Sequence, residues 1–414
     1  MTLPPADSVT AEPLSKDARL ARTLSGTLSG TNLERAGDYN LRTVLQAIRL
    51  QPDITRIEIS QLTGLTAPTI ANITHRLIEM GLVAVVGRRT GVRGHPALKL
   101  RVVPEGAFSI GLNIDRDHLT ILILDLEGAV RARASRETAF ALPEDVADFV
   151  RENLDDVIVA GGVDRTRILG VGVAIPDDLG RISLAHRPAG YERWNDVAID
   201  QVLGALMPWP IHCDNDAAAA ALGEAEYGTA FDNPSFFYLL ISAGLGGGLV
   251  INRSYHRGAA SRSGEIGLMP DPTAPRPGRL VQDTVSMSAL FARLEDAGLA
   301  SPTLEDIAAP TPQVEAVLNH WIQDSVRSLT PPLINLSCLI DPHAVLLGGR
   351  LPADLIARLA DGLKAALGGL TLPSTPKIMP AVIAQDAPAI GAAILPFLDH
   401  LLPSDAILMQ AGRN

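Results

Sequence analysis

Residues 210–227 read PIHCDNDAAAAALGEAEY and join a short apolar segment to a long run of small residues. The apolar start, from Pro210 to Cys213, predicts a strand, and the segment from Ala217 to Tyr227 predicts a helix. Asn215 and Asp216 stand directly before this helix, where side-chain oxygens accept hydrogen bonds from its free amides. If the helix begins at a cleft, the same side chains can also contact a ligand. Capping and ligand binding are therefore both open at this point.

Strands and helices alternate on both sides of this segment. Upstream, strands are expected at 108–114, 119–125, 130–137 and 168–175, and helices at 146–160 and 197–207. Downstream, strands are expected at 236–242, 248–252, 344–347 and 377–383, and helices at 283–297, 313–339, 353–367 and 389–402. Antiparallel strands followed by alternating helix and strand, present twice, describe two α/β lobes. The cleft between such lobes is a place for a small molecule.

A smaller module precedes the lobes. Apolar residues recur at helical spacing over 40–51, 56–62 and 66–81, and Gly64 separates the second helix from the third. The hydroxyl of Thr66 is expected to cap the third helix. A strand at 82–86, a basic loop at 87–96 and a strand at 97–103 follow. Two helices joined by a short turn with glycine form a helix-turn-helix, and the two strands add a wing.

The third helix is expected to enter the major groove of DNA. Residues at its start and on its polar face then meet base edges or phosphates, namely Thr66, Ala67, Thr69, Asn72 and His75. Arg88, Arg89 and Arg93 are expected to lie along the phosphate backbone. The alternative is a helical adaptor or dimerisation module with a solvated basic face. Three arginines on a glycine-rich loop favour DNA, because a pure protein contact has little use for them.

The distribution of charge supports this division. The 414-residue chain has a net charge of −11, yet residues 38–101 hold nine Lys or Arg against four Asp or Glu, a net charge of +5. Residues 102–414 carry −16, and residues 1–37 are balanced. A basic small module on an acidic large one is expected when only one part meets phosphate. The Ser/Thr/Pro-rich segment 1–37 is expected to be a disordered tail.

Several classes of protein are disfavoured. The longest apolar run, 236–250, has only 15 residues and contains four glycines, so it is a poor membrane span. The acidic, proline-containing start does not resemble a signal peptide. Cys213 and Cys338 lie far apart without metal-ligand spacing, which suits a reducing compartment. We expect a cytoplasmic protein with no membrane partner and no metal.

Four motifs resemble signatures of the ROK family (repressors, open reading frames and sugar kinases). They are GHP at 94–96, CDNDAAAAALGE at 213–224, SAGLGGG at 242–248 and GEIG at 264–267. The resemblance covers about residues 38–400. It implies an α/β protein in which an N-terminal winged helix-turn-helix is followed by a two-lobed actin-like (RNase-H-like) ROK domain. The family's repressor branch binds operators as dimers or tetramers that respond to sugars or sugar phosphates.

The resemblance also implies domain limits. The winged helix-turn-helix takes 38–101 and the first actin-like lobe takes 102–228. The second lobe takes 229–387, and the C-terminal helix, 388–403, packs back on the first lobe.

Kinase chemistry is disfavoured by one hairpin. In the family's kinases the residue that matches Asp216 is the catalytic base, and a first phosphate hairpin carries Asp-x-Gly-Gly-Thr. Here that hairpin reads Asn113-Ile114-Asp115-Arg116-Asp117, so side chains replace the glycines and the added negative charges repel a triphosphate. The glycines of 242–248 match the family's second phosphate loop, but a tight turn between two strands explains them equally well. We expect no catalytic residue and no cofactor.

The resemblance assigns sugar contacts to Asn215, Asp216 and Glu265. Leu268 stands where the family has a histidine that contacts sugar and metal, and three zinc-binding cysteines are missing, so we expect no structural zinc. Arg187 is either a contact for a sugar acid or phosphate or a plain surface charge.

These observations favour a homodimeric or homotetrameric transcriptional repressor of carbohydrate-uptake or catabolic genes. It is expected to bind double-stranded operator DNA and to sense a sugar or sugar derivative in its cleft. Two alternatives are a ROK sugar kinase with an accessory domain and a ligand-blind DNA-binding protein whose second module only oligomerises.

Overall fold

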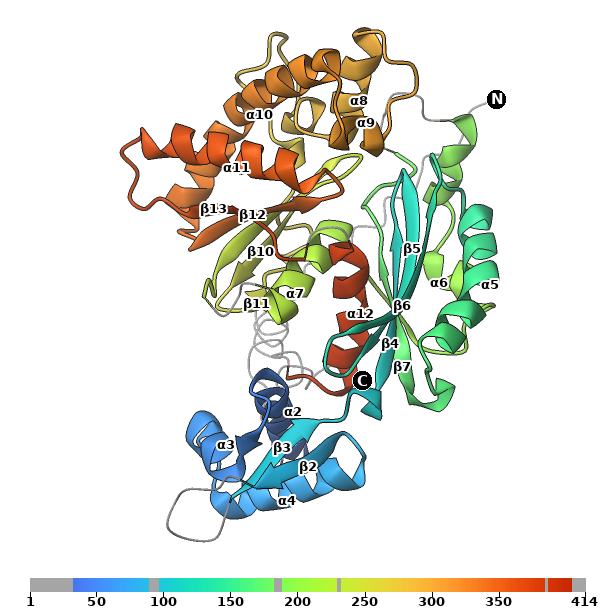
Figure 1. The fold of residues 1–414 in the computed structure, drawn as a ribbon, viewed down its shortest axis with the longest axis vertical. Coiled ribbons are helices and arrows are strands. Elements are labelled where there is room, and N and C mark those ends of the chain that lie inside the picture. The colour runs from blue at the N-terminus through green and yellow to red at the C-terminus, as the bar shows by residue number, and fades with distance from the viewer. Residues whose placement is uncertain (1–32, 89–96, 182–187, 229–231, 384–385, 404–414) are drawn as a thin grey trace, which may run out of the picture. The chain divides into compact units, whose positions relative to one another are not determined.

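The computed structural model describes residues 33–88, 97–181, 188–228, 232–383 and 386–403. Residues 1–32, Arg89, Arg93 and Arg187 lie outside these ranges, so the predictions made for them stay predictions. The described residues form two compact units, those of 33–102 with 401–403 and those of 103–400. The expected fold class is confirmed in both units (Figure 1), and each unit is described by itself.

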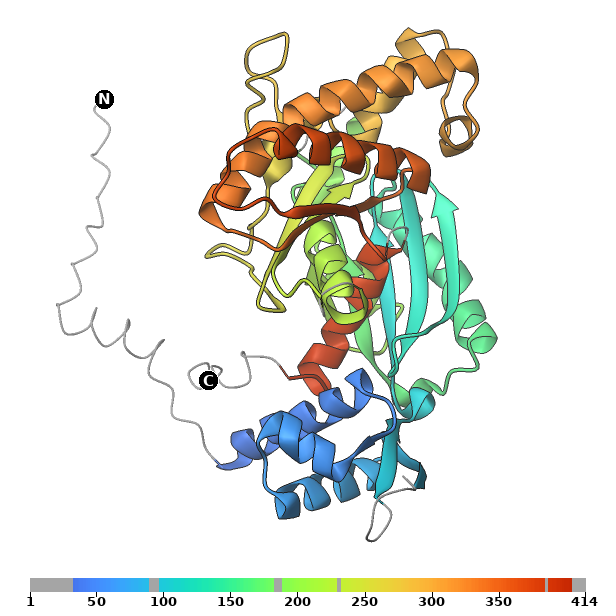
Figure 2. The same cartoon turned by 60° about the vertical axis from the view of Figure 1, so that its left-hand side comes forward.

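Over its described residues the first unit is a three-helix bundle with a small sheet (Figure 2). Its helices are α2 (Leu33–Leu50), α3 (Arg56–Thr63) and α4 (Ala67–Glu79). Its sheet has the order β1 (Ile54–Thr55), β3 (Leu98–Val102) and β2 (Val83–Arg88), with antiparallel pairing. The core of this unit includes the buried side chains of Leu45, Ile48, Ile59, Ile70 and Leu77.

Local sequence explains the turn between α3 and α4. Thr55 and Glu58 form a capping box at the start of α3, and Gly64 ends the helix with a φ of 71°, a conformation that favours glycine.

Two expectations for the first unit need correction. Helix α2 already begins at Leu33, within the segment expected to be a tail. The side chain of Thr66 makes no cap; its Oγ1 instead lies 2.9 Å from Oγ1 of Thr69.

The second unit contains two five-stranded sheets built on one plan. The first sheet has the order β6 (Val130–Glu137), β5 (His118–Asp125), β4 (Phe108–Ile114), β7 (Ile168–Ala174) and β8 (Ile211–Asp214). The second has the order β11 (Ser254–Tyr255), β10 (Leu245–Ile251), β9 (Phe236–Ile241), β12 (Ala344–Gly349) and β13 (Lys377–Pro380). In each sheet the first three strands are antiparallel and the last two pairings are parallel. This repetition is the expected pair of lobes.

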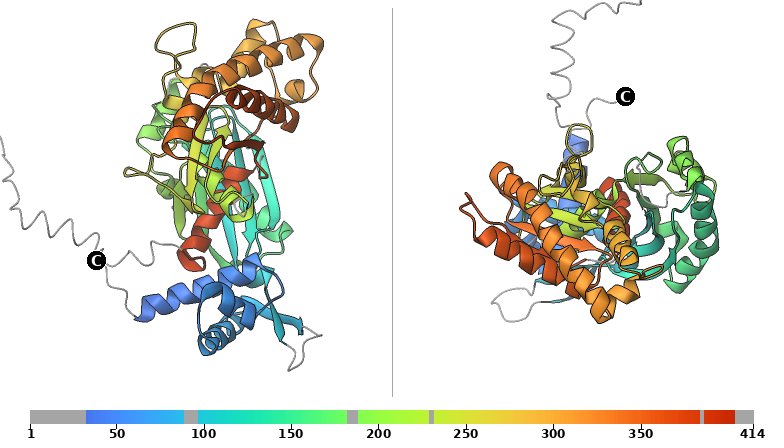
Figure 3. Two further views of the ribbon diagram at one scale, coloured as in Figure 1. Left: turned by 90° about the vertical axis from the view of Figure 1, so that its left-hand side faces the viewer. Right: turned by 90° about the horizontal axis from the view of Figure 1, so that it is seen from above.

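Each sheet is covered by helices on both faces (Figure 3). Helices α5 (Pro143–Ala160) and α6 (Ile199–Gly204) belong to the first lobe. Helices α8 (Met287–Asp296), α9 (Leu304–Ala308), α10 (Pro312–Leu339) and α11 (Ala353–Gly368) belong to the second. None of the helices within the described ranges is long and apolar enough to cross a bilayer.

The two inner helices exchange lobes. Helix α7 (Asp216–Tyr227) follows the last strand of the first sheet but packs on β9 and β10 of the second. Helix α12 (Ala387–His400) comes after the second sheet but packs on β4 and β7 of the first. The two helices also pack on each other so closely that a Cβ atom on Gly391 would overlap the carbonyl oxygen of Ala219. The alanine run therefore allows two crossing helices to meet between the lobes.

Candidate functional site

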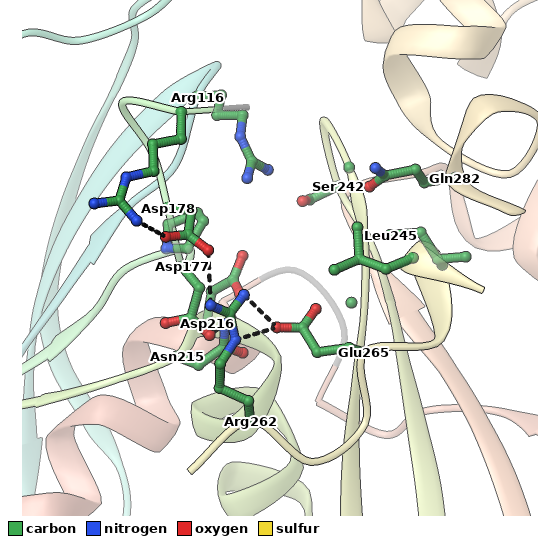
Figure 4. A pocket seen from close by; sticks show the side chains of 15 residues that line it. Arg116, Asp177, Asp178, Asn215, Asp216, Ser242, Leu245, Arg262, Glu265 and Gln282 are labelled. Atoms are coloured by element: carbon green, nitrogen blue, oxygen red, sulfur yellow. Dashed lines mark hydrogen bonds and ion pairs between the residues drawn. The ribbon is translucent and has the colours of Figure 1, made fainter. Parts of the chain in front are cut away.

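A cavity of about 290 Å³ lies between the lobes of the second unit (Figure 4). The first lobe contributes the turn after β4, the segment after β7 and the start of α7. The second lobe contributes the turn between β9 and β10, the segment 262–268 and Gln282. Asn215, Asp216 and Glu265, the described residues to which sequence analysis assigned a sugar, all line this one cavity.

Asn215 performs one of the two functions that the sequence left open, the capping of α7, and its contact with a ligand stays a prediction. Its Oδ1 accepts hydrogen bonds from the amides of Ala217 (2.9 Å) and Ala218 (3.2 Å) and so caps α7. Its Nδ2 donates to Oδ2 of Asp177 at 3.1 Å and lies at the cavity wall. The cap thus fixes the position of an amide group that lines the cavity.

Asp216 is a buried acid with an unusual protonation equilibrium. Its side chain lies in the first turn of α7 and the residue is only 6% exposed. Burial, assisted by the charge of Asp115, raises the pKa of Asp216 to about 7, although Arg116 acts in the opposite direction. Both protonation states are therefore populated near neutral pH. The carboxyl group can donate a hydrogen bond to a ligand in one state and accept one in the other.

Glu265 is held by an arginine that sequence analysis missed. Nη2 of Arg262 lies 3.2 Å from Oε1 of Glu265, and Nη1 of Arg262 lies 2.7 Å from Oδ2 of Asp178 in the first lobe (Figure 4). The arginine therefore bridges the two sides of the cavity. Leu268, which replaces the histidine of the family motif, also lines the wall.

Arg116 is the residue of the altered hairpin that lines the cavity. It is only 8% exposed, and its Nε is buried without a hydrogen bond. Figure 4 shows its guanidinium directed across the cavity toward Ser242 and Gln282. Its Nη1 lies 3.0 Å from the position that a Cβ atom on Gly244 would take. The absence of a side chain at Gly244 leaves room for this cation.

This arrangement corrects the charge argument made from the sequence. We expected the acids of the hairpin to make the phosphate position negative. Neither Asp115 nor Asp117 lines the cavity: Asp115 accepts a 2.7 Å hydrogen bond from the amide of Arg116, and Asp117 pairs with His118 and Arg350. The hairpin side chain that does face the cavity is cationic.

The glycine run after β9 has a packing function. A Cβ atom on Gly246 or Gly248 would come too close to the alanines of α7, and one on Gly247 would overlap Phe237 and Gly264. These three glycines allow β10 to approach α7 and the segment at Gly264. Gly246 and Gly248 therefore need no phosphate to explain them, and Gly244 is the glycine of this run that lies beside Arg116 at the cavity.

Two clusters among the described residues have metal-ligand chemistry. Asp115, Asp117 and His118 form one, and His212, Asp399 and His400 form the other, with potential ligand atoms within 4.8 Å of one another. Arg350 already pairs with Asp117 in the first cluster, which disfavours a cation there. Both cysteines are free and exposed, and neither belongs to either cluster.

The exposed face of α4 carries the side chains expected to contact DNA. Thr66, Ala67, Asn72 and His75 are exposed and Thr69 is half-buried, whereas Ile70, Thr74 and Leu77 are buried on the opposite face. Nε2 of His75 lies 3.2 Å from Glu79. Arg88 is exposed at the end of β2. Arg76, exposed beside His75, is a further cation on this face that sequence analysis did not single out.

Comparison with known proteins identifies both units. A family model described as "ROK family" matches residues 109–397, more than half of the chain. The chain belongs to the ROK family. A second model, described as "Winged helix-turn-helix DNA-binding", matches residues 38–84. This ROK protein thus carries a second recognised domain before its two lobes.

Curated relatives of this ROK protein include an uncharacterized protein, y4fQ, of Sinorhizobium fredii. It is 28% identical over 86% of this chain and 90% of its own length. The xylose repressor of Bacillus subtilis is 25% identical over 56% of this chain and 60% of its own length. The ROK chain therefore spans somewhat less than two thirds of that repressor.

Solved structures share the fold of this ROK protein. A ROK family transcriptional regulator, a homologue of the E. coli Mlc protein, aligns over 91% of this chain and 100% of its own, with a TM-score of 0.67 and 21% identity. A ROK family glucokinase from Streptomyces griseus aligns over 70% of this chain and 99% of its own, with a TM-score of 0.52 and 19% identity. Regulators and kinases of the family thus share these lobes, and of these two structures the regulator is the one that covers nearly the whole chain.

Proposed function

We propose that the chain is a sugar-responsive transcriptional repressor of carbohydrate-uptake or catabolic genes. The observation that carries the proposal is the joining, in one chain, of a winged helix-turn-helix with an exposed polar face to a ROK domain with an interlobe cavity. The similarity to xylose repressors points the same way. The effector binds between the lobes, and the first unit reads the operator.

DNA binding follows from the geometry of α4. A homodimer or homotetramer presents two copies of this helix to half-sites in neighbouring major grooves, with Asn72 and His75 toward the bases and Arg88 along the phosphates. The effector changes DNA affinity because it binds one arrangement of the lobes more tightly than another.

The second unit acts as a sensor and not as a kinase. Arg116 takes the space that glycines leave for phosphates in the family's kinases, and Asn113 has no charge with which to hold a metal-bound phosphate. Asp216 favours the alternative, because a carboxyl group with a pKa of about 7 suits a general base. Steady ADP formation with a sugar, lost in Asp216→Ala, would establish the kinase instead.

The experiment is genome-wide mapping of the DNA that the full chain binds, followed by titration of one bound fragment. We expect nanomolar binding near transporter or sugar-enzyme genes and release by a sugar or sugar derivative. Binding that no sugar alters favours the ligand-blind alternative. Failure to bind double-stranded DNA at low ionic strength contradicts the proposal.

A further inference from the structure

We infer that the effector is a monosaccharide with an anionic group, a phosphate or a carboxylate, which Arg116 binds beside the turn between β9 and β10. This inference rests on the proposed function, because it names the chemical class of the ligand that the interlobe cavity senses. It goes beyond that function by selecting charged sugars over neutral ones.

Arg116 is a buried cation without a hydrogen-bonded carboxylate partner among the described residues. No hydrogen bond or ion pair links the guanidinium of Arg116 to another residue within the described ranges, and its Nε is buried. By contrast, Arg262 pairs with Asp178 and Glu265, and Arg350 pairs with Asp117 and Glu137. Burying a charge without a partner is costly, and a guanidinium is best satisfied by the two oxygens of a carboxylate or phosphate.

The side chain of Arg116 is directed into the cavity. The guanidinium points into the cavity toward Ser242 and Gln282, whereas Asn215 and Glu265 lie at the other end (Figure 4). One end of the cavity therefore offers a cation with polar neighbours, and the other offers amide and carboxyl groups suited to hydroxyls. A ligand that matches both ends has an anionic group at one end and a polyhydroxylated ring at the other.

The size of the cavity limits the size of the ligand. A cavity of about 290 Å³ is at the small end of ligand pockets, which suits one sugar ring with a small substituent. The charge of Arg116 acts on Asp216, which also lines the cavity, and the partial protonation of Asp216 at neutral pH reduces its repulsion of an anion.

The test is calorimetric titration of the full chain with matched sugar pairs. The pairs are glucose with glucose 6-phosphate, glucose with glucuronate, and xylose with xylonate, and inorganic phosphate and ATP are titrated alone. We expect at least one charged sugar to bind tenfold or more tightly than its neutral partner. Phosphate and ATP should bind more weakly than that sugar. The phosphate and carboxylate arms then show which anion the site takes.

Variants connect the preference to Arg116. Arg116→Gln should reduce the charged-over-neutral ratio to near one, and Arg116→Lys should retain part of it. Arg327→Gln is the matched control, because Arg327 does not line the cavity and its 63% exposed side chain pairs with Asp324, so the ratio should be unchanged. Thermal unfolding shows that each variant is folded. The comparison of charged with neutral sugars in the wild-type chain tests the inference without any variant.

Three outcomes overturn the inference: neutral sugars bind as tightly as charged ones, no charged sugar in the panel binds, or the preference survives in Arg116→Gln. None of these outcomes contradicts the proposed repressor function if the same preparation still binds its DNA fragment. Loss of DNA binding by the wild-type chain instead overturns the proposed function.

Discussion

Nη1 of Arg350, in the second lobe, lies 2.9 Å from Oδ2 of Asp117 in the first lobe. The same guanidinium also bonds to Glu137, and Arg350 is only 10% exposed. Arg350 directly follows the two glycines that end β12, whereas Asp117 lies in the turn between β4 and β5. This ion pair therefore joins the two lobes through the same hairpin that carries Arg116. Such a pair adds little net stability, because desolvation of the two charges offsets much of their attraction, but removal of one partner leaves the other charge uncompensated.

Removal of Arg350 should destabilise the second unit. In Arg350→Gln the partly buried Asp117 keeps its charge but loses a partner, so we expect the free energy of unfolding to fall by about 2 kcal/mol. Urea denaturation measures this change. Arg327→Gln is the control, because Arg327 pairs with Asp324 at an exposed site where such pairs contribute under about 1 kcal/mol. Equal effects of the two substitutions would contradict the assignment.

His118 should make the protein more stable in acid. Burial disfavours its charged form, but the hydrogen bond to Asp117 and the charges of Asp115 and Asp117 outweigh this effect and raise the pKa of His118. Protonated His118 therefore stabilises the fold below the pKa of the unfolded chain, about 6.5, and this contribution is lost as the pH rises through the folded-state pKa. His118→Gln should lose stability at pH 5.5 and change less at pH 8.5. If His118→Gln shifts the urea midpoint equally at pH 5.5 and pH 8.5, the predicted role of His118 is wrong.

Asp216→Asn should stabilise the protein at alkaline pH. The unfolded chain releases this proton near pH 4, whereas the folded chain retains it up to about pH 7, so stability falls between these values. Asparagine removes this cost, and its Oδ1 can replace the carboxylate as acceptor for the amide of Ala217. We expect a gain on the order of 2–4 kcal/mol at pH 8 and a smaller gain at pH 5. The free energy of unfolding of Asp216→Asn and of the wild-type chain is measured at both pH values. A lower value for Asp216→Asn at pH 8 would contradict the prediction.

Changes in the first unit should separate affinity from sequence preference. Arg88→Ala with Arg89→Ala should weaken binding to all DNA sequences and lower the slope of log affinity against log salt by about 1 for each phosphate that the protein no longer neutralises. Asn72→Ala should instead change the preferred sequence. Binding of fragment libraries at several salt concentrations distinguishes the two effects. Lys364→Ala, an exposed substitution in the other unit, should leave both quantities unchanged.

Much of the fold could be predicted because its signals are local. Gly64, the alanine run of α7 and the alternation of strand and helix each act over a few residues. The site was predicted only in part, because its ion pairs join distant segments: Arg262 reaches Asp178, and Arg350 reaches Asp117. The direction of the Arg116 side chain depends on the space that Gly244 leaves by having no side chain. The periodicity of a sequence does not reveal such a contact between distant segments. Thr66 failed as a cap because its hydroxyl had a second local partner, Thr69.

The position of α12 on the first sheet has a consequence for biosynthesis. Strands β4 and β7 lie against this helix so closely that Cβ atoms on Gly111 and Gly172 would overlap its backbone. A nascent chain that has emerged only as far as β8 exposes this apolar surface until residues 387–400 leave the ribosome. The first unit has its described α-helices and β-strands by residue 102, so it can fold long before the second unit does. Chains that terminate before α12 should therefore aggregate or be degraded through an uncovered first lobe.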